Sequence, residues 1–211
     1  MALFGLSKRG TPLVVVAPFL LVGLGNPGSQ YLDTRHNVGF QVIDAFFKSE
    51  APSYHFGDFR KKFNGLIAEG HVNTHKIFLL KPLTFMNLSG ESVQHVVHFY
   101  KIPLENILVV HDDIDLPLGM IQLKKGGGNA GHNGLKSLTQ HIGNDYWRLR
   151  VGIGHPGDRE QVTPYVLGHF TPLEKRQISD ISALISHHYP LFLEKDYDAF
   201  RQAILPSKID V

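Results

Sequence analysis

The residues most able to do chemistry are a histidine and a run of acids that each follow an apolar, strand-like segment. Thr34-Arg-His-Asn37 comes shortly after the first such segment, and His111-Asp-Asp-Ile-Asp115 follows Leu108-Val-Val110. Open α/β sheets collect ligands beyond the carboxyl ends of their strands, so we expect His36 near one of these carboxylates. There a carboxylate would orient the imidazole and stabilise its charged form. The alternative is a structural histidine, with the acids forming a solvated turn or a cap.

The sequence contains no cysteine and no motif that marks a serine nucleophile. The chain contains no cysteine, which excludes disulfides, thiolate metal sites and a cysteine nucleophile. It also has no G-x-S-x-G, P-loop or H-E-x-x-H motif. A histidine and an aspartate without such a nucleophile indicate activation of water. Three histidine pairs have spacings that could hold a metal, but they lack a matched carboxylate and we interpret them as surface groups: His71 and His75, His95 and His98, His187 and His188.

A glycine-rich turn follows the first strand-like run. Gly23-Leu-Gly-Asn-Pro-Gly28 fits the dinucleotide pattern G-x-G-x-x-G. A dinucleotide turn must open a helix at once, however, and Pro27 with the residues up to His36 delays the next helix by about two turns. No second strand ends in an acid about twenty residues further on. We therefore interpret the segment as a tight loop that exposes Asn26 where a sheet would bind its ligand.

A second glycine-rich segment carries the most basic surroundings in the chain. Gly126-Gly-Gly-Asn-Ala-Gly-His-Asn-Gly134 follows Lys124 and Lys125, and Arg148 and Arg150 lie on the next strand-like run. Glycine-dense loops let backbone N–H groups approach a ligand, and arginines suit phosphate. Asn133 is equally well placed to cap the following helix. The segment is thus either a phosphate-binding loop or a helix cap.

Composition and periodicity predict the fold. The chain has 211 residues, 43% hydrophobic and 19% charged, and a net charge of +2 that is too mild for coating nucleic acid but allows a local basic site. Alternating strand-like and helix-like runs predict a single α/β domain, a mixed twisted sheet with helices on both faces. The expected strands are 19–25, 63–69, 76–81, 106–111, 119–124 and 147–153, and the expected helices are 38–47, 89–100, 134–142 and the part from 172 onward.

The N-terminal residues could be mistaken for a signal peptide. Lys8 and Arg9 precede an apolar run that reaches Leu24. Pro18 interrupts this run, which is also too short to cross a bilayer, so we interpret its second half as the first buried strand and expect no membrane association. Residues 1–16 are then an extension expected to be mobile, and residues 17–211 a single α/β hydrolase domain with a helical C-terminal part.

Six segments together resemble the bacterial-type peptidyl-tRNA hydrolase family, in the family's order and at near-family spacing over about residues 20–170. They are Val22–Gly28, Tyr31 with Thr34-Arg-His-Asn37, Lys81-Pro with Thr84-Phe-Met-Asn-Leu-Ser-Gly90, His111-Asp-Asp-Ile-Asp-Leu-Pro117, Gly131-His-Asn-Gly-Leu135 and Arg148-Leu-Arg-Val-Gly-Ile-Gly-His-Pro156. The resemblance implies hydrolysis of the ester between a peptide and the 3′-terminal ribose of tRNA. It further implies a cytoplasmic enzyme that binds RNA and needs no metal or cofactor, and we expect a monomer.

The resemblance also assigns roles to residues. His36 matches the general base, and Asp112 the acid that orients it; these two would offer a metal at most two ligands. The amides match groups that position the peptide, the water and the oxyanion, Met86 matches an apolar contact, Tyr31 a substrate contact, and two cations match the grip on the 5′ phosphate of tRNA. The amides are Asn26, Asn87 and Asn133, and the cations are Lys124 and Arg150.

One departure from the family pattern concerns the phosphate grip. Family members usually carry a basic residue two positions before Lys124, where this chain has Gln122, so the grip is expected to be weaker. Two other functions compete with the main hypothesis. A metal-dependent aminopeptidase-like or nucleoside-processing hydrolase would lose activity to a chelator, and an RNA-binding module would bind without forming product.

Overall fold

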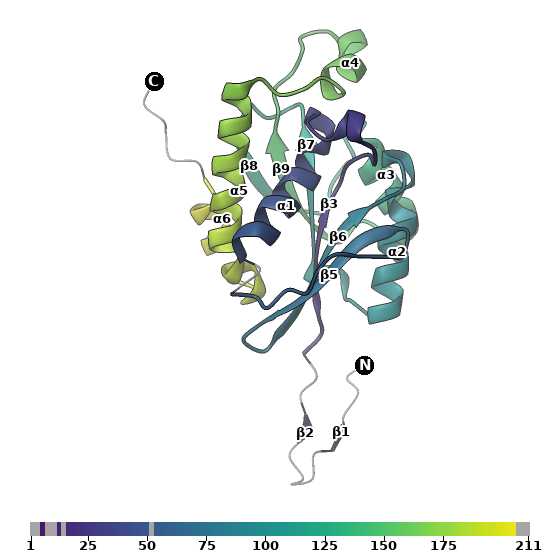
Figure 1. Ribbon diagram of the computed structural model, residues 1–211, viewed down its shortest axis with the longest axis vertical. Coiled ribbons are helices and arrows are strands. Elements are labelled where there is room, and N and C mark those ends of the chain that lie inside the picture. Colours follow the sequence, from purple (N-terminus) through teal and green to yellow (C-terminus); the bar gives the residue numbers. More distant parts are fainter. Residues whose placement is uncertain (1–4, 7–11, 14–15, 51–52, 206–211) are drawn as a thin grey trace.

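A seven-stranded mixed sheet forms the centre of the molecule (Figure 1). The computed structural model describes residues 5–6, 12–13, 16–50 and 53–205. In the sheet the strands follow the order β4-β5-β6-β3-β7-β9-β8, with β3, β6, β7 and β9 parallel and the others antiparallel to their neighbours. The strands are β3 (Phe19–Gly23), β4 (Arg60–Lys62), β5 (Gly65–Val72), β6 (His75–Pro82), β7 (Ile107–Asp113), β8 (Ile121–Lys125) and β9 (Trp147–Gly152).

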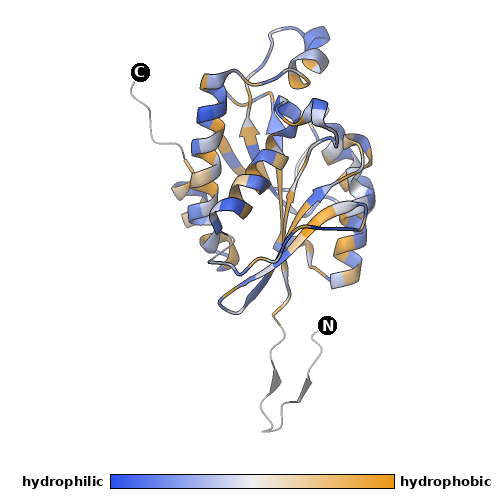
Figure 2. Cartoon of the chain, in the orientation of Figure 1, coloured by the Kyte–Doolittle hydropathy of each residue, from blue (hydrophilic) through white to orange (hydrophobic). Residues whose placement is uncertain are grey.

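Helices cover both faces of the sheet, as the alternation of segments predicts. Phe19 and Leu21 of β3 pack into one apolar cluster with α1, α5 and α6, whereas Leu20 and Val22 pack into the other with α2 and α3. Both faces of the central strands are therefore buried, which explains their continuous apolar runs (Figure 2). The helices are α1 (Val38–Glu50), α2 (Ser89–Tyr100), α3 (Asn133–Ile142), α4 (Val162–Val166), α5 (Pro172–Leu193) and α6 (Tyr197–Ala203).

Two glycines bring the first helix unusually close to the first central strand. A β-carbon on Gly23 would lie 2.2 Å from the carbonyl oxygen of Gly39, and one on Gly39 would lie 2.4 Å from the backbone nitrogen of Leu24. Only glycine permits this approach. As a result the short 3-10 turn η2 (Arg35–Asn37), which precedes α1, lies beside the carboxyl ends of β3 and β7.

Most expected elements are confirmed, and the differences have local causes. The helix over 89–100 is confirmed at both ends, and the helix after Gly28 is delayed until Val38, as expected. The strand expected over 63–69 begins instead at Gly65, because Phe63 and Asn64 adopt positive φ angles of 56° and 53° in a turn after β4. Strand β4 and helix α4 were not predicted.

The acids were expected after their strand, but β7 extends to Asp113, so Asp112 belongs to it. Strands β1 (Gly5–Leu6) and β2 (Pro12–Leu13) pair antiparallel outside the main sheet. The rest of the expected mobile segment, apart from Val16, lies outside the described residues. Among the described helices, none combines the length and apolarity that crossing a membrane requires.

Candidate active site

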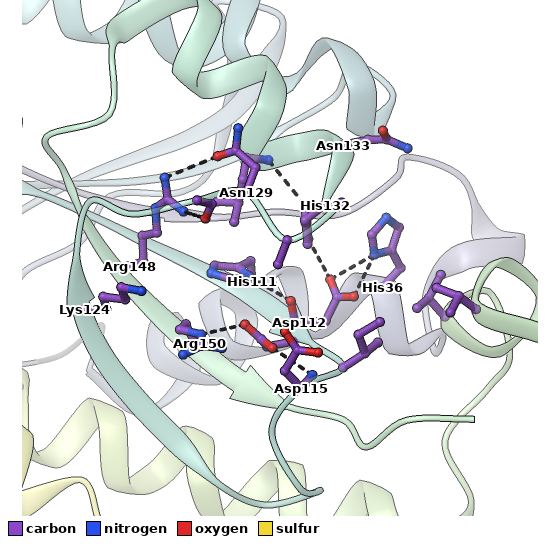
Figure 3. Close-up of a pocket in the computed structure, with 18 of the residues that line it drawn as sticks. His36, His111, Asp112, Asp115, Lys124, Asn129, His132, Asn133, Arg148 and Arg150 are labelled. Carbon is purple, nitrogen blue, oxygen red and sulfur yellow. Dashed lines mark hydrogen bonds and ion pairs between the residues drawn. The ribbon is translucent and has the colours of Figure 1, made fainter. Parts of the chain in front are cut away.

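The structure brings the predicted histidine and acid together. His36 lies on η2 and Asp112 near the end of β7, 76 positions apart in the sequence. The Nδ1 atom of His36 lies 2.9 Å from both carboxylate oxygens of Asp112 (Figure 3). Because a carboxylate accepts, Nδ1 must carry the proton, and Nε2 is the nitrogen left to take one from a substrate or water.

A second histidine, whose role the sequence did not indicate, holds the same carboxylate. Nε2 of His132 lies 3.0 Å from Oδ1 of Asp112. Its Nδ1 accepts hydrogen bonds from the backbone nitrogens of Gly134 and Leu135 at 3.1 and 3.3 Å. Nδ1 is therefore unprotonated, so His132 is the neutral tautomer that donates from Nε2. Asp112 lies between two imidazole donors.

The pKa values of the pair follow from this arrangement. Burial alone would lower the pKa of His36, but the charge of Asp112 and the hydrogen bond to it raise that pKa above its ordinary value. Burial would raise the pKa of Asp112, yet the histidines on either side and their hydrogen bonds hold it well below the usual range. The acid is thus ionised at neutral pH, and His36 is a stronger base than a free histidine.

A third histidine, His111, is buried next to His36, Asp112 and His132. His111 is buried on β7, and its Nδ1 donates to the backbone oxygen of Asp112 at 2.7 Å. Burial lowers the pKa of His111 to about 3, so this ring is neutral at cellular pH. Its edge faces the His132 ring, with centroids 5.1 Å apart. A neutral ring does not compete with His36 for the charge of the Asp112 carboxylate.

His132 adds a third possible metal ligand to the two expected from His36 and Asp112. Ligand atoms of His36, Asp112 and His132 lie within 4.8 Å of one another. The hydrogen bonds nevertheless argue against His132 as an ordinary ligand. Its Nδ1 already accepts from the backbone, so a metal at Nε2 would require an imidazole without protons on either nitrogen. Neutral imidazole is the usual ligand.

Amide groups shape one side of the site. The side chain of Asn37 is fully buried and holds both backbone groups of Asn26, at 2.8 and 2.9 Å. The side-chain oxygen of Asn26 in turn accepts from the backbone nitrogen of Met86 at 2.8 Å. The expectation that the loop exposes Asn26 was wrong, because these contacts leave the residue only 8% exposed. With its side-chain oxygen engaged, Nδ2 is the group of Asn26 left to act as a donor. Asn37 follows His36 directly, and its supporting role was not predicted.

The turn η3 (Met86–Leu88) places two further predicted residues beside α3. A β-carbon on Gly134 would lie 2.6 Å from the sulfur of Met86, so glycine allows the two segments to meet. Asn87 on this turn and Asn133 at the start of α3 are both exposed. The interpretation of Asn133 as the helix cap was wrong, because the His132 ring takes the capping position and leaves the Asn133 amide free of that task.

The two predicted cations lie on the strands at the other end of the site. Lys124 is exposed on β8, and Arg150 is partly buried on β9. Nε of Arg150 donates to Asp113 at 2.6 Å, and its Nη1 donates to the side-chain oxygen of Gln122. Gln122 is the cross-strand partner of Arg150. Gln122, at the position where the family resemblance led us to expect a cation, therefore orients Arg150.

Arg148 does not join this pair, although the sequence grouped it with Arg150. It is 2% exposed, and its guanidinium donates to the backbone oxygen of Gly128 at 2.6 Å and to the side-chain oxygens of Asn129 and Asn144. These contacts tie the glycine-rich loop to β9. Arg148 is a support for the loop, and both of its terminal guanidinium nitrogens are already engaged.

A cavity of about 470 Å³ joins the histidine end to the cation end. Its lining includes five of the predicted residues, together with three residues of the segment around α4 (Figure 3). The predicted residues are His36, Asp112, Lys124, Asn133 and Arg150, and those around α4 are Val162, Thr163 and Val166. Asn26, Tyr31, Met86 and Asn87 are outside this lining; Tyr31 lies on η1 (Ser29–Tyr31), where its backbone oxygen accepts from Thr34.

Comparisons with known proteins point in one direction. The sequence profile of the peptidyl-tRNA hydrolase family matches residues 20–210. The chain is 49% identical to the peptidyl-tRNA hydrolase of Beijerinckia indica and 46% identical to that of Ehrlichia canis, over 88% of its own length and 91% and 93% of theirs. The crystal structure of peptidyl-tRNA hydrolase from Acinetobacter baumannii superposes with a TM-score of 0.83 at 38% identity, covering 91% of this chain and 96% of that one.

Proposed function

This chain belongs to the peptidyl-tRNA hydrolase family and hydrolyses the ester bond of peptidyl-tRNA, and we propose that His36 activates the attacking water. The observation that carries this proposal is the 2.9 Å contact between Nδ1 of His36 and Asp112. It fixes the tautomer in which Nε2 is free to accept a proton. A base with a pKa near neutrality is the efficient choice at cellular pH.

In the proposed reaction Nε2 of His36 removes a proton from water while the water oxygen attacks the ester carbonyl carbon. The ionised Asp112 stabilises the imidazolium that forms. The tetrahedral intermediate then collapses, the bond to the 3′-terminal ribose oxygen breaks, and His36 returns the proton to that oxygen. The products are a peptide with a free carboxylate and a tRNA with a free ribose hydroxyl. Neither a metal nor a cofactor takes part.

The amides are proposed to hold the acyl group. Nδ2 of Asn26 is available as a donor because its side-chain oxygen is engaged by Met86. Exposed amides at Asn87 and Asn133 flank the same region and can position the peptide backbone, the water and the developing oxyanion. An amide offers both a donor and an acceptor to any peptide backbone, which suits a substrate of variable sequence. Met86 supplies an apolar contact and Tyr31 a further substrate contact.

The cation end of the cavity is proposed to bind the 5′ phosphate at the acceptor end of tRNA. Lys124 is exposed, and Arg150 is held in place by Asp113 and Gln122. A phosphate in this position would receive charge-assisted hydrogen bonds. We further propose that residues 17–211 act as one catalytic domain, as a monomer in the cytoplasm, and recycle tRNA from stalled or abandoned translation.

Replacing the base tests the proposal. Wild type, His36→Ala and the exposed control His98→Ala are incubated with an N-blocked aminoacyl-tRNA, and the released tRNA is measured. We expect His36→Ala to lose at least about 10²-fold in turnover, since general base catalysis contributes effects of that size. Binding of tRNA and the circular dichroism spectrum should be retained, and the control should match wild type. If His36→Ala kept a tenth of the wild-type rate, His36 would not be the base.

A further inference from the structure

We propose that Arg35 and Glu174 form a clamp that positions the catalytic histidine against the wall of the cavity formed around α4. The inference rests on the proposed role of His36. Arg35 precedes His36 on η2, and Glu174 lies in the first turn of α5, 139 positions away. Arg35 is a positioning residue in this proposal, because it acts on the substrate only through its neighbours.

The clamp combines an ion pair with aromatic packing. Nη2 of Arg35 donates to both carboxylate oxygens of Glu174, at 3.1 and 3.0 Å. The guanidinium carbon lies 4.5 Å from the ring centroid of Tyr165 and 5.5 Å from that of Phe170. The side chains of the ion pair are 11% and 19% exposed, so water screens the attraction weakly. A guanidinium can stack and pair at once, which an ammonium does poorly.

The segment that Arg35 contacts, around α4, forms one wall of the cavity. Tyr165 belongs to α4, and Val162, Thr163 and Val166 of the same helix line the cavity opposite the catalytic strands. Backbone contacts dock this segment on the catalytic loop, since the nitrogen of Arg35 donates to Gly168 at 3.0 Å. Helix α4 therefore lies beyond the carboxyl ends of β7 and β9 (Figure 1). The Arg35 side chain adds the link between that wall and η2.

The catalytic histidine is held from both sides by its chain neighbours. Asn37 ties η2 to the loop after β3 through the backbone of Asn26. Arg35 ties the same turn to the start of α5. A turn of three residues has little stiffness of its own, so these two anchors, together with the contact to Asp112, decide where the His36 ring lies. A displacement of about 1 Å at a reacting group can lower a rate about 10²-fold.

A neighbouring ion pair provides a matched control. Lys175 and Asp33 join the same two segments at 2.7 Å, one residue from Glu174 and two from Arg35. Their side chains are 45% and 56% exposed, however, and pairs of that kind contribute little. Lys175→Ala removes a link between the same segments without changing the buried clamp. The comparison separates positioning from general attachment.

The test uses two variants that each preserve part of the clamp. Arg35→Lys keeps the positive charge but loses the planar fork and the stacking. Glu174→Gln keeps a side chain able to form the capping box with Thr171, so α5 retains its start. Steady-state kinetics with peptidyl-tRNA are measured for both and for Lys175→Ala. We expect kcat to fall about tenfold in the two clamp variants with little change in KM, and less than twofold in the control.

A measurement without substrate completes the test. The pKa of the His36 ring is followed by NMR titration of the free protein. The charged and titratable groups facing this ring are Asp112 on β7 and His132 before α3. The Arg35→Lys substitution changes neither group and keeps the positive charge at position 35. If the clamp is loosened, His36 moves from Asp112 and its pKa falls toward the ordinary value. Lys175→Ala should leave that pKa unchanged.

Two results would overturn the clamp. One is wild-type kcat and an unchanged His36 pKa in both Arg35→Lys and Glu174→Gln. The other is an equal loss in all three variants with an unchanged pKa, which would mean that the contact only attaches the segment. Neither result touches the proposed base, which fails only if His36→Ala remains active. The two proposals can thus be rejected separately.

Discussion

The two ends of the cavity differ in burial and in how their charges are paired. At the histidine end, His36, Asp112 and His132 share hydrogen bonds of 2.9 to 3.0 Å, and the Asp112 side chain is only 3% exposed. At the cation end, Lys124 is exposed and half of the positive charge is offset by the Asp113–Arg150 pair. Proton transfer needs fixed geometry and a shielded charge. Capture of a phosphate needs charge that is free to meet it.

The two ends should therefore be sensitive to different changes in conditions and sequence. Buried hydrogen bonds depend on protonation and on the identity of each atom, so the histidine end should be sensitive to pH and to single-atom replacements. Exposed cations act through Coulomb attraction, which salt screens over about 8 Å at physiological ionic strength. The cation end should therefore respond to salt and to whether the substrate carries the phosphate.

The largest further effect is expected from Asp112→Asn, which breaks the network by exchanging one oxygen for nitrogen. The rate should fall about 10²-fold, less than in His36→Ala, since the base remains. The pKa of His36 is raised by the Asp112 charge, so its loss lowers that pKa. The acidic limb of the kcat/KM profile should then move to lower pH, which a pH–rate series measures.

The control for this prediction lies in the same run of acids. Asp115 is exposed beyond the end of β7, and Asp115→Asn should behave as wild type. Asp113→Asn should affect tRNA binding through Arg150 and leave the acidic limb in place. A shift of that limb in either control, with none in Asp112→Asn, would show that the wrong acid has been assigned.

An intermediate effect is expected at the cation end. Lys124→Ala and Arg150→Ala should each weaken binding of full-length peptidyl-tRNA about tenfold at low salt, the size of a lost charge-assisted hydrogen bond. The salt dependence of binding should also become shallower, by about one unit of log–log slope per contact. Filter binding over a salt series measures both quantities.

A substrate without the phosphate sharpens the contrast between the ends. Short aminoacyl-nucleotide mimics that lack the 5′ phosphate should be cleaved equally well by wild type and by both cation variants. Lys124→Ala is the cleaner change, because Arg150→Ala also releases Asp113 and Gln122. Equal losses on long and short substrates would mean that these side chains support the fold and do not bind phosphate.

The smallest effect, none at all, is expected from removing metal. Three ligand atoms lie close together at the histidine end, yet Nδ1 of His132 is occupied by the backbone of α3. Activity should survive EDTA followed by exhaustive dialysis, measured as release of tRNA. Loss of activity that zinc restores would make a metal-bound hydroxide the nucleophile and would replace the proposed role of His36.

Local signals in the sequence determined the elements and the principal pair. The apolar run before Gly23 predicts a buried strand, and Pro27 with the residues after it predicts the delay before α1; both were confirmed. The meeting of His36 with the acids could be expected because the carboxyl ends of neighbouring parallel strands share an edge. That inference needs only the order of strands and helices. Which of the three acids makes the contact came from the family resemblance.

Tertiary packing alone decided the rest. Arg148 and Arg150 have the same period-two placement on β9, yet the glycine-rich loop engages and buries the first, whereas the second stays partly exposed. His132 is a cap and a donor only because the start of α3 lies beside Asp112, near the end of β7. The link from Arg35 to Glu174 spans 139 positions. Periodicity indicates how neighbours within a few residues are arranged. A contact between residues 139 positions apart depends on how whole elements pack, which no local pattern in the sequence encodes.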